Sequence, residues 1–396
     1  MKIPWLKIIS AKNQPPTAFI VPCHEPWERP ADFIRQTCLE LAKSHPVWVI
    51  LEPTGQFWLA AVISKLSQLI GLAKSSAPVL PTNSTQNLVF LQPLWLFPGN
   101  RWPLIHQLNQ TIFLWWLKIK LNKFSVWLWI FEPNFWFYPQ VISSWVNWRS
   151  LYDCVDDHSQ TAPALTQQIK DQEQKLIYGV TAFVTNSQVL AQLHTPNRPP
   201  TAVVAQGFDL DLWPKKLKKL VAKTQSPIIF LAGALDDRVD WPLMSWLVKQ
   251  LPQARFLLAG PVSSAAQSQL NQLWPKIPAN VRFLGYLPRQ KLTDWLVQAQ
   301  VCLIPYRFQL PSVKHCFPMK VLEYFAFGKP VVASSISELK LYQPLVTLAK
   351  NQTDWLKALK LHLNSPWPLR LRRQQRQVAW QHRWSVKIDQ ILKLIL

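Results

Sequence analysis

The sequence predicts an α/β protein with two doubly wound domains that face a cleft. Short apolar runs alternate with amphipathic segments along the chain, and the runs are continuous rather than alternating in polarity. Such runs are typical of parallel strands that helices cover on both faces. This rhythm is interrupted once, by prolines and lysines around residues 195–225, and 396 residues are enough for two domains with separate cores.

The first half of the chain contains six expected strands with helical patterns between them. The helical patterns cover residues 30–43 and 102–118. The strand segments are 17–22, 47–53, 88–93, 126–133, 151–157 and 181–186. Strands that alternate with helices predict a mostly parallel sheet.

The second half repeats this pattern with a glycine near the end of each early strand. The strand segments are 228–233, 255–260, 281–285, 301–306 and 330–334. Gly207, Gly233, Gly260 and Gly285 follow one another at intervals of 26, 27 and 25 residues, which is the length of one strand and one crossover helix. Each glycine either makes a tight turn or lets a ligand approach the backbone, and both interpretations remain open.

Three segments follow from this organisation. Residues 1–205 are expected to form the first domain, residues 206–372 the second, and residues 373–396 a basic amphipathic helix. In two facing α/β domains, ligands bind at the carboxyl ends of the strands.

Residue spacing excludes several functional classes. No two glycines are closer than 16 positions, which excludes a Walker A loop, a G-x-G-x-x-G fingerprint and a G-x-S-x-G elbow. The nearest histidines are 20 apart and the nearest cysteines 14 apart, so there is no H-E-x-x-H or C-x-x-C. Five scattered cysteines suit a reducing compartment, so we expect a cytoplasmic location.

The net charge of +22 predicts an anionic partner. No stretch reaches 18 uninterrupted apolar residues, and no cleaved signal peptide is expected. The segment 104–123 places Trp, Leu and Ile beside three lysines, and 215–223 and the Arg-rich C-terminus add positive charge. We expect peripheral contact with an anionic membrane, with a thick core under a basic exterior as the alternative.

At this point a resemblance to a known family becomes clear. The second half resembles the donor domain of retaining GT-B glycosyltransferases of family 4, or "group 1". The first half is similar to glycosyltransferases of cell-surface polysaccharide assembly, of the teichuronic-acid type. The matching segments are QGFD (206–209), FLAG (230–233), FLLAGP (256–261), NVRFLGYLP (280–288), VCLIPY (301–306), PMKVLEYFAFGKPVVAS (318–334), PWERP (26–30), LYDCVDDHS (151–159) and TAFVTNSQVL (181–190). The resemblance implies the GT-B fold, with a C-terminal helix that crosses back to the first domain.

The segment 318–334 carries the most chemistry. Pro318 suits the first turn of a helix, and Lys320 and Glu323 share a face near its N-terminus. Backbone donors, the positive helix end and Lys320 together make a diphosphate site. The resemblance gives Glu323 the role of the second acid of an E-x7-E motif, which holds the nucleotide ribose. The alternative is an exposed Lys–Glu pair.

Two positions depart from the family pattern. His315 stands where many relatives have a first acid that contacts the transferred sugar, so His315 either binds the sugar or phosphate or is an ordinary loop residue. After Gly233, Ala234 stands where relatives often have an arginine. Arg238 is the substitute cation that could grip the diphosphate with two bonds, unless it pairs with a neighbouring aspartate.

The acceptor side is expected where the strand 151–157 ends. Asp156, Asp157 and His158 stand there, and one carboxylate could orient the acceptor hydroxyl or take its proton. We favour Asp157, with an N-cap role as the alternative. Arg29, near the cleft by resemblance, contacts an acceptor phosphate or is a solvated helix start.

These observations predict a retaining glycosyltransferase at the inner face of the plasma membrane. It would transfer a hexose from a nucleoside-diphosphate sugar to a surface glycan or exopolysaccharide, with a lipid-linked acceptor favoured. We expect no metal and no cofactor, since Lys320, Arg238 and the helix end surround the diphosphate. The alternatives are an epimerase of the same fold and a decayed protein that binds glycan or membrane. A nucleic-acid binder is disfavoured because no such module is visible.

Overall fold

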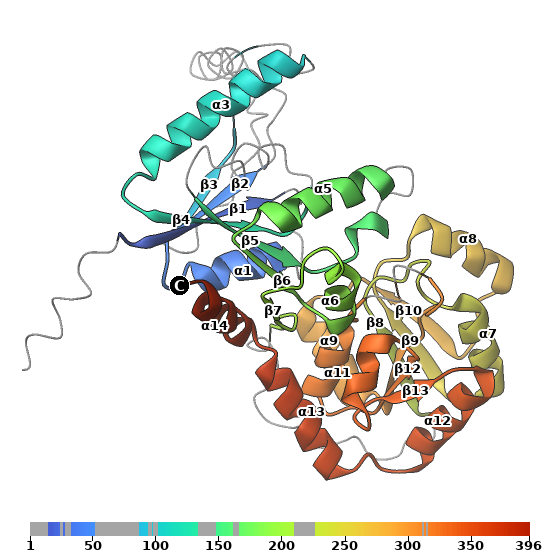
Figure 1. The fold of residues 1–396 in the computed structure, drawn as a ribbon. Helices are drawn as coiled ribbons and strands as arrows, with labels where there is room; N and C mark the ends of the chain where they lie inside the picture. The colour runs from blue at the N-terminus through green and yellow to red at the C-terminus, as the bar shows by residue number, and fades with distance from the viewer. Residues whose placement is uncertain are drawn as a thin grey trace, which may run out of the picture.

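The computed structural model has two lobes, each with a parallel sheet flanked by helices (Figure 1). The structure describes residues 15–23, 27, 33–51, 87–93, 97, 102–133, 148–160, 166–209, 226–310, 313 and 316–396. Arg29, His315 and the lysine-rich segment 215–223 lie outside these residues. The predicted α/β class and GT-B arrangement are confirmed.

The first lobe has a seven-stranded parallel sheet in the order β3-β2-β1-β4-β5-β6-β7. Its strands are β1 (Thr17–Cys23), β2 (Val47–Leu51), β3 (Leu88–Leu91), β4 (Ser125–Ile130), β5 (Arg149–Cys154), β6 (Ala182–Thr185) and β7 (Ala202–Val203). Six of them were predicted. The seventh, β7, has two residues, which is too short to give a hydrophobic run.

Helices cover both faces of this sheet, as the continuous apolar runs predicted. One core cluster joins the sheet to α1 (Phe33–Leu41) and to the C-terminal helix. The cluster on the other face includes residues of α3 (Pro103–Lys120), α5 (Thr166–Gly179) and α6 (Gln188–His194). A short 3-10 helix, η3 (His158–Gln160), follows β5.

The second lobe has a six-stranded parallel sheet in the order β10-β9-β8-β11-β12-β13. Its strands are β8 (Ile228–Ala232), β9 (Arg255–Ala259), β10 (Val281–Gly285), β11 (Val301–Ile304), β12 (Val331–Ser334) and β13 (Thr347–Ala349). Its helices are α7 (Trp241–Gln250), α8 (Ser264–Leu273), α9 (Arg289–Gln298), α11 (Lys320–Ala326), η5 (Ser337–Tyr342) and α12 (Gln352–Asn364). The sequence did not predict β13, which has three residues.

The C-terminal segment consists of two helices rather than the single helix expected over 373–396. These are α13 (Leu369–Gln381) and α14 (Trp384–Ile395). The break falls where the chain passes from the second lobe to the first, and there the Phe208 N–H donates to the His382 carbonyl. Helix α13 contacts α11, whereas α14 lies beside α1 of the first lobe (Figure 1). The crossing back to the first lobe is thus present.

A buried ion pair fastens α14 to the first sheet. Lys387 Nζ lies 2.9 Å from Asp153 Oδ2 and donates to Gln206 Oε1 at 3.0 Å, and the Lys387 and Asp153 side chains are at most 1% exposed. Beside this pair, the Trp384 ring lies so close to Gly207 that a Cβ there would come within 2.3 Å of it. Gly207 is therefore needed for close approach of α14.

A second contact joins the lobes on the other side. Glu338 of η5 accepts a hydrogen bond at 2.8 Å from the Val189 N–H at the start of α6. A carboxylate is favourable at that position because the helix N-terminus carries unsatisfied donors and a positive dipole end. The two lobes are thus connected at η5–α6 and through α14.

Replacement of Lys387 by Met is predicted to destabilise the protein strongly. The change leaves the Asp153 carboxylate buried without its cation, a situation that costs about 3–5 kcal/mol. Lys393→Met, on the exposed side of the same helix, should change stability by less than about 0.5 kcal/mol. Urea unfolding followed by circular dichroism compares the two variants, and equal effects would contradict this role of the pair.

Candidate active site

The candidate site lies at the carboxyl edge of the second sheet, where β8, β9 and β10 end in glycine turns. Gly233 N donates to Ala259 O at 2.9 Å, and Gly260 N donates to Gly285 O at 2.8 Å. A Cβ on Gly260 would lie 1.9 Å from Gly233 O, so the turns stack too closely for a side chain. The periodic glycines therefore make tight turns and leave an edge of bare backbone, as expected for a surface that a ligand approaches closely.

Lys320, the first residue of α11, extends to this edge. Its Nζ lies 3.1 Å from the position that a Cβ on Gly233 would take, and 4.7 Å from the ring centre of Tyr306. The residue is 8% exposed, and its Nζ has no hydrogen-bond partner among the described residues. A buried cation without a counter-charge is unfavourable. The arrangement is therefore suited to an anion.

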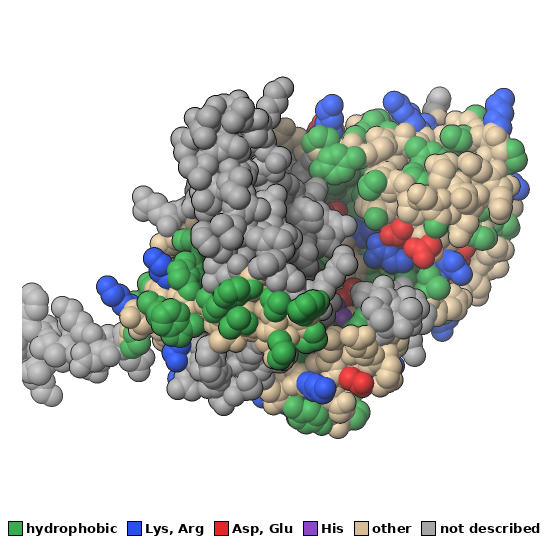
Figure 2. Space-filling model, turned by 90° about the horizontal axis from the view of Figure 1, so that it is seen from above, with side chains coloured by type: hydrophobic (Ala, Val, Ile, Leu, Met, Phe, Trp, Pro, Cys, Tyr) green, Lys and Arg blue, Asp and Glu red, His purple; other side chains and the backbone are tan. Residues whose placement is uncertain are grey.

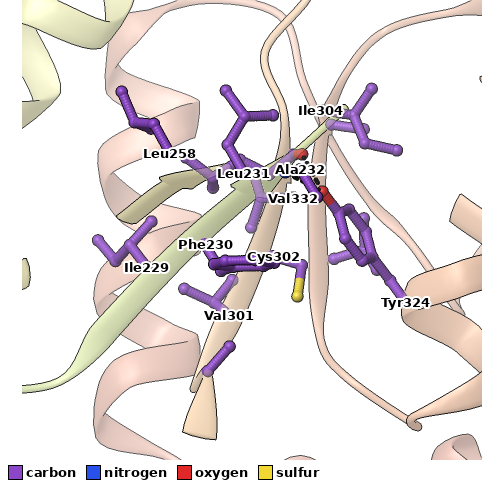
Figure 3. Packing of buried hydrophobic residues seen from close by; sticks show 14 of the residues in the cluster. Ile229, Phe230, Leu231, Ala232, Leu258, Val301, Cys302, Ile304, Tyr324 and Val332 are labelled. Atoms are coloured by element: carbon purple, nitrogen blue, oxygen red, sulfur yellow. Dashed lines mark hydrogen bonds between the residues drawn. The ribbon is translucent and has the colours of Figure 1, made fainter. Parts of the chain in front are cut away.

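Tyr324 fixes the position of Lys320. It stands four residues later on α11, so the two residues are on the same side of the helix. Its buried hydroxyl accepts from Ala232 N at 3.0 Å and donates to Leu303 O at 3.3 Å. Figure 3 shows this ring reaching the end of β8 through the apolar core. Because Ala232 directly precedes Gly233, the same bonds align α11 with the glycine turn.

The tip of α11 offers fewer backbone donors than the sequence suggested. Pro318 is buried and its carbonyl accepts from Val321 N at 2.9 Å, while the carbonyl of Met319 accepts from Leu322 N at 3.0 Å. The helix starts with a tight turn that uses these two N–H groups locally. The positive charge of the site therefore depends mainly on Lys320.

Arg238 lies beside Lys320 but forms an ion pair. Its Nη2 is 2.6 Å from Asp236 Oδ2, and its Nε donates to both Asp236 oxygens at 3.0 and 3.1 Å. These bonds raise the pKa of Arg238 further above its usual value. Its guanidinium lies 5.6 Å from the Tyr306 ring centre, so one ring contacts both cations. The sequence analysis left open whether Arg238 binds the diphosphate or pairs with a neighbouring aspartate. In the structure it pairs with Asp236.

Glu323 lies one turn into α11 and is partly exposed. It follows Lys320 by three residues, so both side chains start from the same face of the helix, as the sequence predicted. His315, the other residue of the expected acidic motif, lies outside the described residues, as does Arg29 on the acceptor side.

On the first lobe, the two adjacent aspartates after β5 have different surroundings. Asp157 is 6% exposed, and its Oδ1 accepts from Ser159 N at 3.2 Å and from Ser159 Oγ at 2.6 Å. It thus caps η3, the alternative that the sequence left open. Asp156 is exposed and accepts from Asp157 N at 2.9 Å. The acceptor-side role of Asp157 stays a prediction, and of the two carboxylates that of Asp156 is the more accessible.

His158 is buried behind these aspartates and is 9% exposed. Burial lowers the pKa of its imidazole to about 4, although a hydrogen bond with the Phe131 backbone and the charge of Asp157 act in the opposite direction. The ring is therefore neutral at neutral pH. It can exchange hydrogen bonds with a hydroxyl there, but it does not supply a positive charge.

The two sides of the site meet near Cys316. Burial and the negative charge of Asp156 raise the pKa of the Cys316 thiol to about 12, while Arg238 and Lys320 act to lower it. The Asp156 carboxylate of the first lobe is therefore within electrostatic reach of the same thiol as both cations of the second lobe. Figure 2 shows a hollow between the lobes with basic, acidic and histidine side chains in it.

Two tyrosines of the site were missed by the sequence analysis. Tyr306 follows β11 and contacts Lys320 and Arg238, and Tyr324 fixes α11. For Tyr306 there was a signal, since it stands at the end of a predicted strand on the edge where ligands bind. Tyr324 gave none, because an aromatic residue in a helix usually indicates core packing.

Comparisons with known proteins agree with this geometry. Residues 226–360, which include Gly233, Lys320 and Glu323, match the family model described as Glycosyl transferases group 1. A curated relative from Bacillus subtilis is TuaH, described as a teichuronic acid biosynthesis glycosyltransferase. It is 22% identical over 287 residues, which cover 67% of this chain and 70% of TuaH. The resemblance found in the sequence is confirmed.

Solved structures agree on the fold. Anabaena HepE, solved in complex with UDP and glucose, superposes with a TM-score of 0.62 at 12% identity, covering 95% of this chain and 98% of HepE. The trehalose-6-phosphate synthase OtsA superposes with a TM-score of 0.65 at 11% identity, covering 95% of this chain and 98% of OtsA. These superpositions establish the two-lobed fold. The sequence identities are too low to indicate the substrate.

The buried histidine predicts a pH dependence of stability. Because the pKa of His158 is about 4 in the folded chain and 6.5 in a peptide, the unfolded chain binds more protons between these values. The free energy of unfolding therefore falls as the pH is lowered through this window. Between about pH 7 and 4.5, the free energy of unfolding of His158→Gln should fall by about 2 kcal/mol less than that of the wild type. Urea unfolding at both pH values measures it, and parallel profiles of wild type and variant would contradict it.

Proposed function

We propose that this chain, a glycosyltransferase of the GT-B fold, transfers a hexose from a nucleoside-diphosphate sugar to a hydroxyl of a surface glycan, with retention of configuration. The observation that carries the proposal is the Lys320 ammonium group, which is buried, lacks a hydrogen-bond partner among the described residues, and lies at the Gly233 turn. A diphosphate would supply the counter-charge that this cation lacks. Anabaena HepE, which shares the fold, holds UDP and glucose.

In this proposal each donor-side residue has a distinct role. Lys320 binds the diphosphate, and the bare backbone at Gly233 allows it close approach. Glu323 accepts hydrogen bonds from the ribose hydroxyls. Arg238 would add a second cation next to the diphosphate, by exchanging one of its bonds to Asp236 for a phosphate oxygen.

The transfer step would depend on charge stabilisation and alignment. Negative charge develops on the diphosphate as its bond to the sugar breaks, and a cation already fixed in place stabilises that charge without reorganisation. Asp156 would orient the acceptor hydroxyl from the opposite lobe, while the departing phosphate takes its proton. Alignment across the cleft turns the reaction into one within a single complex. Retention is the stereochemistry that the resemblance to family 4 implies.

For the acceptor we propose a lipid-linked surface glycan presented at the inner face of the plasma membrane. TuaH, a relative described as a teichuronic acid biosynthesis glycosyltransferase, supports a glycan as the acceptor. None of the described helices has the length and apolar character needed to cross a bilayer. The proposal therefore requires another means of reaching such an acceptor, and α3 offers one.

Helix α3 has an apolar face that points to solvent. Leu104, Leu108, Trp115 and Ile119 are 80, 45, 59 and 50% exposed. At about 100° per residue these four positions fall within roughly 60° of one another, so they form one stripe along the helix. Figure 2 shows this band of hydrophobic side chains, with basic side chains at one end.

The chemistry of this stripe fits an anionic membrane surface. Lys118 and Lys120 in the last turn of α3 are exposed, and Trp102 at its start is 69% exposed. Aromatic and aliphatic residues beside lysines are typical of helices that lie in the membrane interface. A lysine near an anionic surface contributes about 1 kcal/mol. We therefore assign α3 as the membrane-facing element.

The donor site is tested by a thermal-shift screen against UDP-, GDP- and ADP-sugars. A cognate donor should raise the melting temperature of the wild type, and this rise should be lost in Lys320→Met and strongly reduced in Glu323→Ala. Without donor, Lys320→Met should melt at or above the wild-type temperature, because an unpaired buried charge has been removed.

Lys329→Met is the matched control. Lys329 is a buried lysine of the same lobe, but its Nζ donates to two carbonyls, of Val297 and Ala299, each at 2.8 Å. This variant should melt at a lower temperature and keep the rise induced by the donor. A donor that stabilises Lys320→Met as much as wild type would contradict the assignment. The product assay without acceptor separates transfer from epimerisation, because an epimerase converts the sugar nucleotide alone.

The membrane assignment predicts loss of vesicle binding in a variant with Leu104, Trp115 and Ile119 changed to Ser. Binding to anionic vesicles should weaken by about tenfold or more, because most of the apolar area that enters the interface is lost. The control changes Ile277, Leu341 and Leu361 to Ser, three exposed apolar residues of the second lobe. Vesicle flotation compares them, and equal binding by both variants would contradict a role for α3.

A further inference from the structure

We propose that Cys154, Glu173 and His194 form a binding site for one zinc ion in the first lobe, separate from the diphosphate site. Among the residues that the structure describes, these three form a group whose Sγ, Oε1 and Nε2 atoms all lie within 4.8 Å of one another. All three residues are buried. The proposal is independent of the transferase activity.

The three potential ligand atoms form a nearly equilateral triangle. Cys154 Sγ is 3.8 Å from Glu173 Oε1 and 3.8 Å from His194 Nε2, and the latter two atoms are 3.7 Å apart. Bond lengths of about 2.3 Å to sulfur and about 2.0–2.1 Å to nitrogen and oxygen give edges of roughly 3.3–3.6 Å in a tetrahedral zinc site. A small inward movement of the side chains would therefore complete three sides of such a site.

These distances also indicate that hydrogen bonds among the three side chains do not hold them together. A separation of 3.7 Å between His194 Nε2 and Glu173 Oε1 is too long for a hydrogen bond. The contacts of a thiol at 3.8 Å are weak. Tyr152 OH does donate to Glu173 Oε1, at 2.5 Å, which holds the carboxylate in place. A tyrosine that orients a carboxylate ligand is the kind of outer-shell partner that metal sites use.

Each ligand comes from a different element of the fold. Cys154 ends β5, Glu173 lies in the middle of α5, and His194 is in the last turn of α6. Ligands on a strand and two packed helices are held more rigidly than ligands on loops. A bound ion would join β5, α5 and α6. Because Cys154 precedes Asp156 by two residues, the ion would also fix the start of the turn that contains Asp156.

A hollow of about 380 Å³ adjoins the group and gives access to a fourth ligand. Its lining includes Glu173, His194 and Asp157. Water from this hollow can complete a tetrahedral site that has three protein ligands. Burial raises the pKa of Glu173 to about 7 and lowers that of His194, while the charge of Asp157 acts to raise both. Asp157 therefore lies close enough to add to the negative potential that favours a cation.

The donor set selects the type of ion. Thiolate and imidazole are ligands for zinc and other late transition metals, whereas magnesium and calcium take oxygen ligands. Binding would displace the thiol proton, which burial and the neighbouring carboxylate otherwise retain. The sequence analysis expected no metal, so this proposal departs from it; the site lies in the lobe opposite the diphosphate site, and the role that we propose for the ion is structural.

The test uses the full chain purified after chelator treatment and titrated with zinc chloride or cobalt chloride. We expect one equivalent of zinc by elemental analysis, a rise of a few degrees in melting temperature, and cobalt spectra with a thiolate charge-transfer band and tetrahedral d–d bands. These readouts need neither donor nor acceptor.

Cys154→Ala and His194→Gln should lose the bound equivalent and the thermal rise. Cys302→Ala, which removes a buried strand cysteine of the second lobe, should keep both. Because the wild-type cobalt spectrum does not depend on whether a variant folds, the proposal remains falsifiable. Absence of zinc, of stabilisation and of a thiolate band in the wild type would overturn it and leave a hydrogen-bonded cluster. A thiolate band retained in Cys154→Ala would overturn the assignment of the ligand.

Discussion

The buried pair between Lys387 and Asp153 links both sides of the active site to one C-terminal element. Helix α14 carries Lys387 and is fastened by it to β5, whose chain continues directly into the Asp156 turn. Helix α13, immediately before it, contacts α11, the helix that begins with Lys320. Lys320 and Asp156, for which we propose donor-side and acceptor-side roles, are therefore positioned by two consecutive helices joined at a short break. A displacement of α14 would move the acceptor turn, and one of α13 would move the donor helix.

Three buried lysines among the described residues have three different environments, and the comparison supports the role that we propose for Lys320. Lys387 is paired with a carboxylate, and Lys329 donates to two carbonyls. Burial lowers the pKa of Lys329 to about 8, even with these partners. Lys320 is also buried, but among the described residues its Nζ lies over the Tyr306 ring and has no hydrogen-bond partner. Protein interiors rarely retain such a charge without compensation, which supports our proposal that Lys320 binds an anionic ligand.

The sequence predicted the fold well because strands and helices follow from patterns within one segment of the chain. It predicted the site less well because the contacts of the site join residues that are far apart in the sequence. Strand runs and regularly spaced glycines gave eleven of the strands, whereas β7 and β13 are too short to be visible in a pattern. Asp157 caps the turn that follows it, and the sequence offered this only as an alternative because nothing in two adjacent aspartates reveals which one is the cap. The pairing of Arg238 was foreseen only as an alternative. Cys154 and His194 are 40 residues apart, so only folding reveals that they are neighbours.

The charge of the molecule and the charge of its donor site call for different explanations. At the site, Asp236 pairs with Arg238, so Lys320 is the cation that has no hydrogen-bonded counter-charge among the described residues. A net charge of +22 therefore cannot be explained by donor binding, which needs one or two cations. The excess must lie on surfaces with another task, and α3 combines exposed lysines with an exposed apolar stripe. A water-facing helix has no need for such a stripe, whereas a helix in an anionic interface uses both features. In the membrane contact that we propose, the exposed lysines and tryptophans of α3 would have one physical explanation, and the donor site would have another.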